Sequence, residues 1–153
     1  MKKIILYLIM AISILGAQHV DGEYSVKGKE YYYGWLSTTS IEVEDGKIVK
    51  IITDKINENG ALATNDKKYN KDMKDKTGVS FDEFSVKGPK NLMKAFNKNK
   101  ETKNTPTKTI KNYLPKVDMV AGATHSSKEF EKMMEFLVKK AQSGDVGDYS
   151  IKL

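Results

Sequence analysis

Residues 118–127 of this 153-residue chain, DMVAGATHSS, form the segment whose residue types are best explained by chemistry rather than by packing. The three small residues at 121–123 would let a ligand approach the backbone closely. Thr124 offers a hydroxyl two positions before Ser126, the predicted N-cap of the next helix. The free N–H groups and the positive dipole end of a helix start stabilise an anion such as phosphate. The segment therefore predicts either a phosphate-binding turn or, more simply, a tight turn before a helix.

The helix that must position this segment is the clearest predicted element of the chain. Ser126 and Glu129 have the spacing of a capping box, in which each side chain binds the other's free backbone N–H. Apolar residues then recur at helical spacing, and Ser143-Gly144 ends the pattern. The stripe, which predicts a core-facing helix, consists of Phe130, Met133, Met134, Leu137, Val138 and Ala141.

A β-hairpin is predicted upstream, over residues 39–53. Asp45-Gly46 is a dipeptide that tolerates positive φ, and it separates an alternating arm from a more continuously apolar one. We expect the second arm, 47–53, to lie inside the sheet because both of its faces are apolar. A shorter strand is expected at 24–27.

Two further helices are expected in the middle of the chain. The first spans 66–76, with Tyr69 and Met73 on one face and Gly78 just beyond its end. The second begins at Pro89, a residue suited to a first helical position. Residues 145–153 form either a loop or an edge strand. The predicted fold class is α+β: an antiparallel sheet with a hairpin, packed by the C-terminal amphipathic helix and one or two shorter helices.

Composition excludes several classes of function. The chain has a formal net charge of +6, all 26 basic residues are Lys, and acidic residues alternate with them in stretches such as 66–76, so we expect no nucleic-acid binding. Cysteine is absent, which rules out disulfides, thiolate catalysis and Cys-ligated metals. With two separated histidines, we predict no metal site and no catalytic acid–base group.

The N-terminal residues 1–17 read as a secretory signal peptide, with Lys2 and Lys3 followed by an apolar stretch. That stretch is short for a membrane span, although a retained N-terminal anchor is the alternative. Gln18 stands where a lipoprotein would have its acylated cysteine, so no lipid anchor is expected. We therefore predict an exported chain, in the periplasm, at the cell surface or outside the cell, with residues 18–153 as one domain.

The segment Asp118-x-x-Ala121-Gly122-Ala123-Thr124, with a hydroxyl residue two positions on, resembles the flavinylation motif of the FMN-binding domain family. That family includes FMN-carrying subunits of sodium-translocating NADH:quinone reductases and exported electron-transfer lipoproteins. The resemblance extends over roughly residues 21–141. It rests also on Asp21-Gly22-Glu23-Tyr24, Tyr32-Tyr33-Gly34, Glu44-Asp45-Gly46-Lys47-Ile48, Lys68-Tyr69-Asn70-x-x-Met73 and Gly78-Val79-Ser80.

The resemblance implies FMN as the cofactor, joined by a flavin transferase through a phosphodiester to Thr124. Asp118 would be the acidic residue of the recognition motif, and the small residues that follow would form the close backbone turn. Ala121 departs from the pattern, since many members have Ser there. The expected cofactor-binding residues are Asp118, Ala121, Gly122, Ala123, Thr124, His125, Ser126 and Ser127. His125 is included because it adjoins Thr124 and, when protonated, could hydrogen-bond the phosphate; the alternative is a solvated loop residue.

Three aromatic residues, Tyr32, Tyr33 and Trp35, are candidates to stack on the flavin ring or to border it, although ordinary core packing explains them equally well. The resemblance implies an electron carrier rather than a free-standing enzyme. Its partners would be the transferase and redox donors and acceptors, proteins or quinones, at the cell envelope, with membrane contact through the N-terminal segment. The alternatives are an exported surface module of the same fold without flavin, and a non-covalent FMN binder within a reductase.

Overall fold

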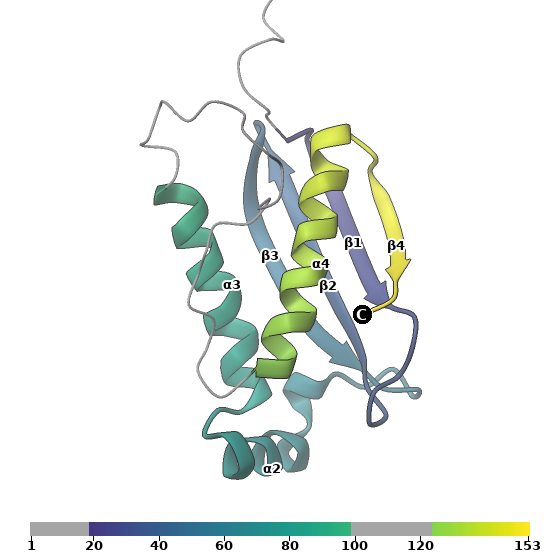
Figure 1. Cartoon of the computed structure of the whole chain (residues 1–153), viewed down its shortest axis with the longest axis vertical. Helices are drawn as coiled ribbons and strands as arrows, with labels where there is room; N and C mark the ends of the chain where they lie inside the picture. The colour runs from purple at the N-terminus through teal and green to yellow at the C-terminus, as the bar shows by residue number, and fades with distance from the viewer. Residues whose placement is uncertain (1–18, 99–123) are drawn as a thin grey trace, which may run out of the picture.

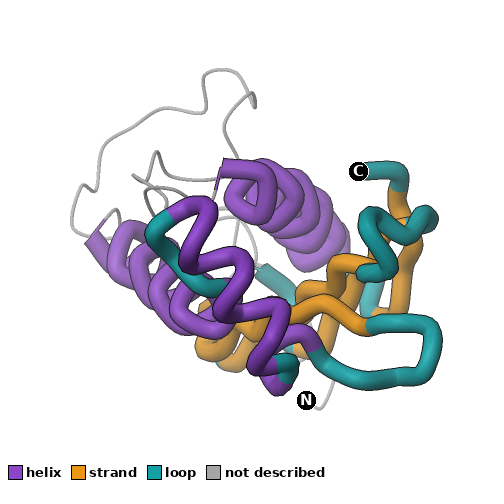
Figure 2. Tube along the Cα trace, turned by 90° about the horizontal axis from the view of Figure 1, so that it is seen from below, coloured by secondary structure: helices purple, strands orange, loops and turns teal. Residues whose placement is uncertain are grey.

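The computed structural model describes residues 19–98 and 124–153, which form one sheet and a set of helices on one of its faces (Figure 1). The four strands lie in the order β3-β2-β1-β4. Viewed from below, α3 and α4 lie on the same side of the sheet (Figure 2). The predicted α+β class is confirmed. The expected signal peptide lies outside the described residues.

The predicted hairpin is confirmed as β2 (Leu36–Glu44) and β3 (Lys47–Ile56). Asp45 and Gly46 have φ values of 50° and 72°, the positive angles that a two-residue hairpin turn requires. The predicted interior position of β3 is wrong, because β3 is an edge strand. The helices cover one face only, so Val49 and Ile52 remain 45% and 49% exposed on the strand.

The sheet is mixed rather than purely antiparallel as predicted. β1 (Gly22–Gly28) pairs antiparallel with β2, but β4 (Gly147–Ile151) pairs parallel with β1. The reason lies in the preceding helix, which ends beside the start of β1: the Val20 N–H donates to the Ala141 carbonyl over 2.7 Å. The strand after that helix therefore leaves in the same direction as β1.

The helix predicted at 66–76 is confirmed as α2 (Lys67–Thr77), which follows the short 3-10 helix η1 (Ala63–Asn65). The Asp66 side chain accepts a hydrogen bond from the Tyr69 N–H at its start. Gly78, with φ 81°, ends it in the left-handed conformation that glycine permits. Tyr69 and Met73 pack against the core from one face, as expected.

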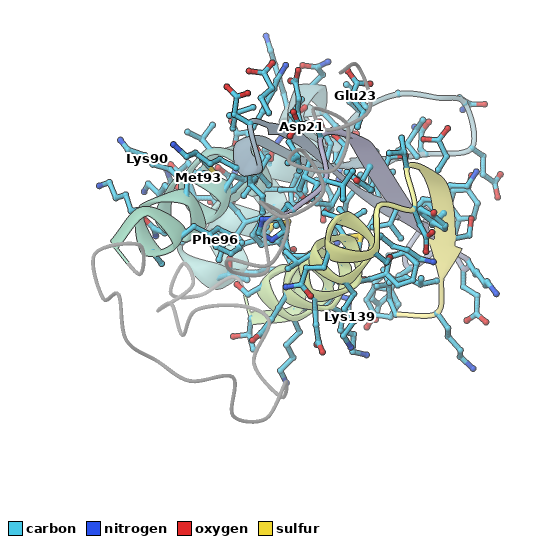
Figure 3. The ribbon with its side chains drawn as sticks, turned by 90° about the horizontal axis from the view of Figure 1, so that it is seen from above. Asp21, Glu23, Lys90, Met93, Phe96 and Lys139 are labelled. Carbon is cyan, nitrogen blue, oxygen red and sulfur yellow. The ribbon has the colours of Figure 1, made fainter. Side chains whose placement is uncertain are left out.

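The next helix, α3 (Phe81–Lys98), begins well before Pro89, where the sequence predicted its start. Asp82 and Glu83 lie in its first turn, where acidic side chains favour a helix start. Pro89 therefore lies inside the helix and is buried there. In Figure 3, Phe96 lies on the side of α3 that faces the sheet and α4, whereas Lys90 lies on the outer side.

The C-terminal helix α4 (Thr124–Ser143) carries the predicted apolar stripe, and every member of it is buried. Phe130 packs edge-on against Phe84 of α3, with ring centroids 6.0 Å apart. The core lies between these helices and the inner face of β1, β2 and β3. Over residues 19–98 and 124–153, no helix is both long and apolar enough to cross a membrane.

Candidate functional site

Thr124 is exposed and is the first residue of α4. The predicted capping box is wrong, because Ser126 is the third helical residue and is buried at 5% exposure. Thr124 consequently lies in the helix, among the first backbone N–H groups, which have no partner within the helix itself. The hydroxyl is thus closer to the positive end of the helix dipole than the sequence indicated.

The first turn of α4 suits an anion in two further respects. It contains no acidic residue. Ser127 is 7% exposed, and its hydroxyl is buried with no hydrogen-bond partner in the described part of the chain. Buried hydroxyls normally have a hydrogen-bond partner, so the Ser127 hydroxyl, one turn from Thr124, has the capacity to bind a ligand.

Glu129, in the next turn, reaches into the protein with one carboxylate oxygen and back toward the first turn of the helix with the other. Its Oε2 accepts from the Ser37 hydroxyl of β2 at 2.7 Å and from Lys55 Nζ of β3 at 2.9 Å. Its Oε1 lies 3.2 Å from Nε2 of His125. We call these four residues the Glu129 cluster. It ties the first two turns of α4 to two strands of the sheet.

Charge within the Glu129 cluster is balanced. Burial by itself would raise the pKa of Glu129, but the positive charge of Lys55 and the hydrogen bonds from Ser37 and Lys55 lower it, with a further contribution from His125. The net result is a pKa below the ordinary 4.5, so the carboxylate is ionised at neutral pH. The Lys55 ammonium also lies 5.5 Å from the centroid of the Phe81 ring.

The loop between β1 and β2 brings a tyrosine to the site. Tyr32 stacks on His125 with ring centroids 4.5 Å apart and an interplanar angle of 31°. Tyr33 contacts Tyr32 edge-on at 4.5 Å and is 86% exposed. Contact of these tyrosines with a flavin ring stays a prediction. The ring of Trp35 packs on Tyr69, 5.1 Å away, toward the core.

An open cleft of about 500 Å³ lies beside these residues. Its walls combine the aromatic side chains of the β1–β2 loop with the exposed side of α4 and the C-terminal residues. The lining includes Tyr31, Tyr32, His125, Lys128, Lys132 and Leu153. Eight of the twelve lining residues are charged, four lysines and four glutamates, so the cleft is polar, with two tyrosines and a histidine among its walls.

Of the residues that the sequence predicted, the structure brings Thr124, His125, Ser127 and Tyr32 together at one end of α4. Asp118, Ala121, Gly122 and Ala123 lie outside the described residues.

Sequence reasoning missed the roles of Glu129 and Lys55. A signal for Glu129 exists, because Glu129, Met133 and Leu137 recur every four residues and so share the buried face of α4. Similarly, Ile51, Thr53 and Lys55 alternate along β3 toward its buried face. The spacing along α4 thus indicates that Glu129 faces the core, and the alternation along β3 indicates the same for Lys55.

The fold and the site together define an α+β domain with an anion-suited helix start beside an open, largely charged cleft that two tyrosines and a histidine help to line. A family model, described as the FMN-binding domain, matches residues 34–139, more than half of the chain. The chain therefore belongs to the FMN-binding domain family, and its cofactor is FMN. This assignment favours the flavin-carrying interpretation over a flavin-free surface module.

Among solved structures, the chain is similar to the CPE2226 protein from Clostridium perfringens. The TM-score is 0.73 at 27% sequence identity, over 88% of this chain and 98% of that one. No curated protein matches the sequence.

Proposed function

We propose that this protein is an exported flavoprotein that carries FMN on Thr124 through a phosphodiester and relays electrons at or outside the cell envelope. The observation that carries the proposal is the placement of Thr124. It is the exposed first residue of α4, in a turn without acidic side chains, beside a cleft walled by Tyr32 and His125.

The phosphate end of the cofactor matches the groups at this helix start. In the attachment step, the Thr124 hydroxyl oxygen forms a bond to the phosphorus of a phosphoanhydride-activated FMN. The anhydride bond breaks, the leaving phosphate departs, and the hydroxyl proton passes to solvent or to a base of the transferase. The resulting diester keeps one negative charge, which the backbone N–H groups of the first turn stabilise. The Ser127 hydroxyl, which has no partner among residues 19–98 and 124–153, is a further donor within this turn.

The cleft matches the ring end of the cofactor. The redox chemistry is supplied by the isoalloxazine ring, whereas the protein sets its position, dielectric surroundings and exposure to solvent. Tyr32 and His125 contribute aromatic rings to the cleft, and its open side leaves room for a redox donor or acceptor to approach. A covalent linkage suits an exported carrier, since flavin held by weak contacts alone would be lost by dilution.

Intact mass spectrometry of the full chain co-expressed with a flavin transferase tests the attachment. We expect the mass of FMN minus water to be added to the wild type and to be absent from Thr124→Ala. Thr77→Ala, at the exposed end of α2, is the matched control and should carry the adduct. An unmodified wild-type mass under these conditions would refute covalent attachment.

Acid precipitation distinguishes covalent from non-covalent flavin in the same sample. Yellow colour that stays with the precipitated protein supports the phosphodiester. Colour released into the supernatant would refute the phosphodiester and indicate that FMN is bound non-covalently. Export is tested separately, by whether the mature chain is recovered outside the cytoplasmic fraction with residues 1–17 removed.

A further inference from the structure

Glu129 connects the N-terminal end of α4, where Thr124 lies, to the sheet. One carboxylate oxygen binds Ser37 and Lys55, from two different strands, at 2.7 and 2.9 Å. The other faces His125, one turn earlier on the helix and adjacent in sequence to Thr124. The two oxygens of a single side chain therefore connect the sheet to the first turn of α4.

A buried ion pair is an unusual way to fasten a helix. The Lys55 and Glu129 side chains are only 6% and 11% exposed, so both charges have lost most of their water. Well-packed apolar side chains at such positions are often as stabilising or more so. What the ionic pair adds is direction, because hydrogen bonds fix the orientation of a group whereas apolar contacts leave it free to slide.

The fixed orientation of Glu129 also constrains His125, which lines the cleft. An ionised carboxylate can only accept a hydrogen bond, so the contact of 3.2 Å between Glu129 Oε1 and His125 Nε2 favours the form of the imidazole that carries its hydrogen on Nε2. His125 also contacts Tyr32, whose ring centroid lies 4.5 Å from that of the imidazole. The imidazole thus contacts Glu129 through Nε2 and Tyr32 through its ring, and Nδ1 is its remaining polar atom.

We propose that Glu129, held by Lys55 and Ser37, is a positioning residue that fixes His125 and the first turn of α4 for the flavin on Thr124. This inference rests on the proposed function, since it concerns the surroundings of the same cofactor. It assigns the buried Lys55–Glu129 pair a role in orienting the flavin site rather than in holding the fold together.

The test replaces the pair with apolar residues of similar size, as Lys55→Met together with Glu129→Leu. The matched control replaces an exposed pair on α2, Lys71 and Asp75, whose side chains are 74% and 63% exposed. We expect both double variants to fold. The control should load flavin from the transferase at the wild-type rate, whereas Lys55→Met/Glu129→Leu should load at least about tenfold more slowly, because a misplaced reacting group loses rate steeply.

The circular dichroism of the bound flavin in the visible region provides a second readout, since it reports how firmly the ring is oriented by its surroundings. We expect a weaker signal per flavin in Lys55→Met/Glu129→Leu than in the wild type. The exposed-pair control should match the wild type.

A third readout needs no flavin. Nitrogen-15 spectra of the imidazole groups distinguish a ring protonated at Nε2 from one protonated at Nδ1. The chain has only two histidines, so His19→Gln assigns the signals of His125. We expect the Nε2–H form to dominate in the flavin-free wild type and both forms to be populated in Lys55→Met/Glu129→Leu.

Two results would overturn the inference on its own: a wild-type loading rate and flavin signal in the folded Lys55→Met/Glu129→Leu variant, or an unchanged imidazole spectrum in that variant. A wild-type chain that takes up no flavin at Thr124 would instead refute the proposed function, and this inference with it. The two failures are distinguishable because the imidazole spectrum is recorded without cofactor.

Discussion

Breaking the Lys55–Glu129 pair from one side should destabilise the protein far more than removing both partners. Lys55→Met leaves a carboxylate, and Glu129→Leu leaves an ammonium, at positions whose side chains are nearly inaccessible to water. Removal of one member of a buried pair costs about 3–5 kcal/mol, because the remaining charge is left uncompensated. In the double variant no charge remains, and we expect a free energy of unfolding within about 1 kcal/mol of the wild type or higher.

Urea unfolding followed by far-ultraviolet circular dichroism measures these differences for the wild type, the two single variants and the double variant. The comparison requires that the slope of the free energy of unfolding against urea concentration be the same in all four proteins. The coupling between the two substitutions should then be several kcal/mol, well beyond the range of about 0.2–1 kcal/mol found for exposed pairs. If each single variant loses less than about 1 kcal/mol, the pair behaves as a solvated one, and the argument from burial is refuted.

Three further predictions concern the acid stability of the same pair, the start of α2 and the two faces of β3. Because the pKa of Glu129 is lowered in the folded state, its contribution to stability is complete above its ordinary value of 4.5 and is lost as the pH falls through the folded value. The free energy of unfolding of Lys55→Met/Glu129→Leu should therefore fall less than that of the wild type over this acidic range, and the difference between the two pH profiles measures the contribution of Glu129. Asp66→Ala removes the cap of α2 and should cost about 1 kcal/mol in urea unfolding, whereas no loss would show that the cap is dispensable. Ile52→Thr, on the open face of β3, should change the free energy of unfolding by less than about 0.5 kcal/mol, while Ile51→Thr, on the buried face, should cost about 1–3 kcal/mol; equal effects would contradict the one-sided covering of the sheet.

The elements that the sequence predicted correctly are those encoded by local patterns. Asp45-Gly46 specifies a hairpin turn through its own backbone angles, and the apolar stripe of α4 specifies a buried helix face through its spacing. Both signals depend on residues close together in the chain. They survive folding because the tertiary structure agrees with them.

The predictions that failed depend on contacts between distant parts of the chain. Pro89 is compatible with a helix start, yet Phe81 and Phe84 add a buried face upstream of it and extend α3. Ser126 and Glu129 have the spacing of a capping box, but Lys55, 74 residues away in sequence, offers the carboxylate a buried partner. The position of β3 at the sheet edge likewise depends on the strand order, which no local pattern contains.

The hydrogen bond between the Val20 N–H and the Ala141 carbonyl has a consequence for how the molecule would be presented to its partners. It fixes the entry of the chain at the C-terminal end of α4, and the 20 residues of that helix, at 1.5 Å each, separate this end from Thr124 by about 30 Å. The helix thus acts as a rigid spacer between the two ends of the domain. Anything that binds the chain just before Val20 would hold one end of the domain, and the end that carries Thr124 would project away from it.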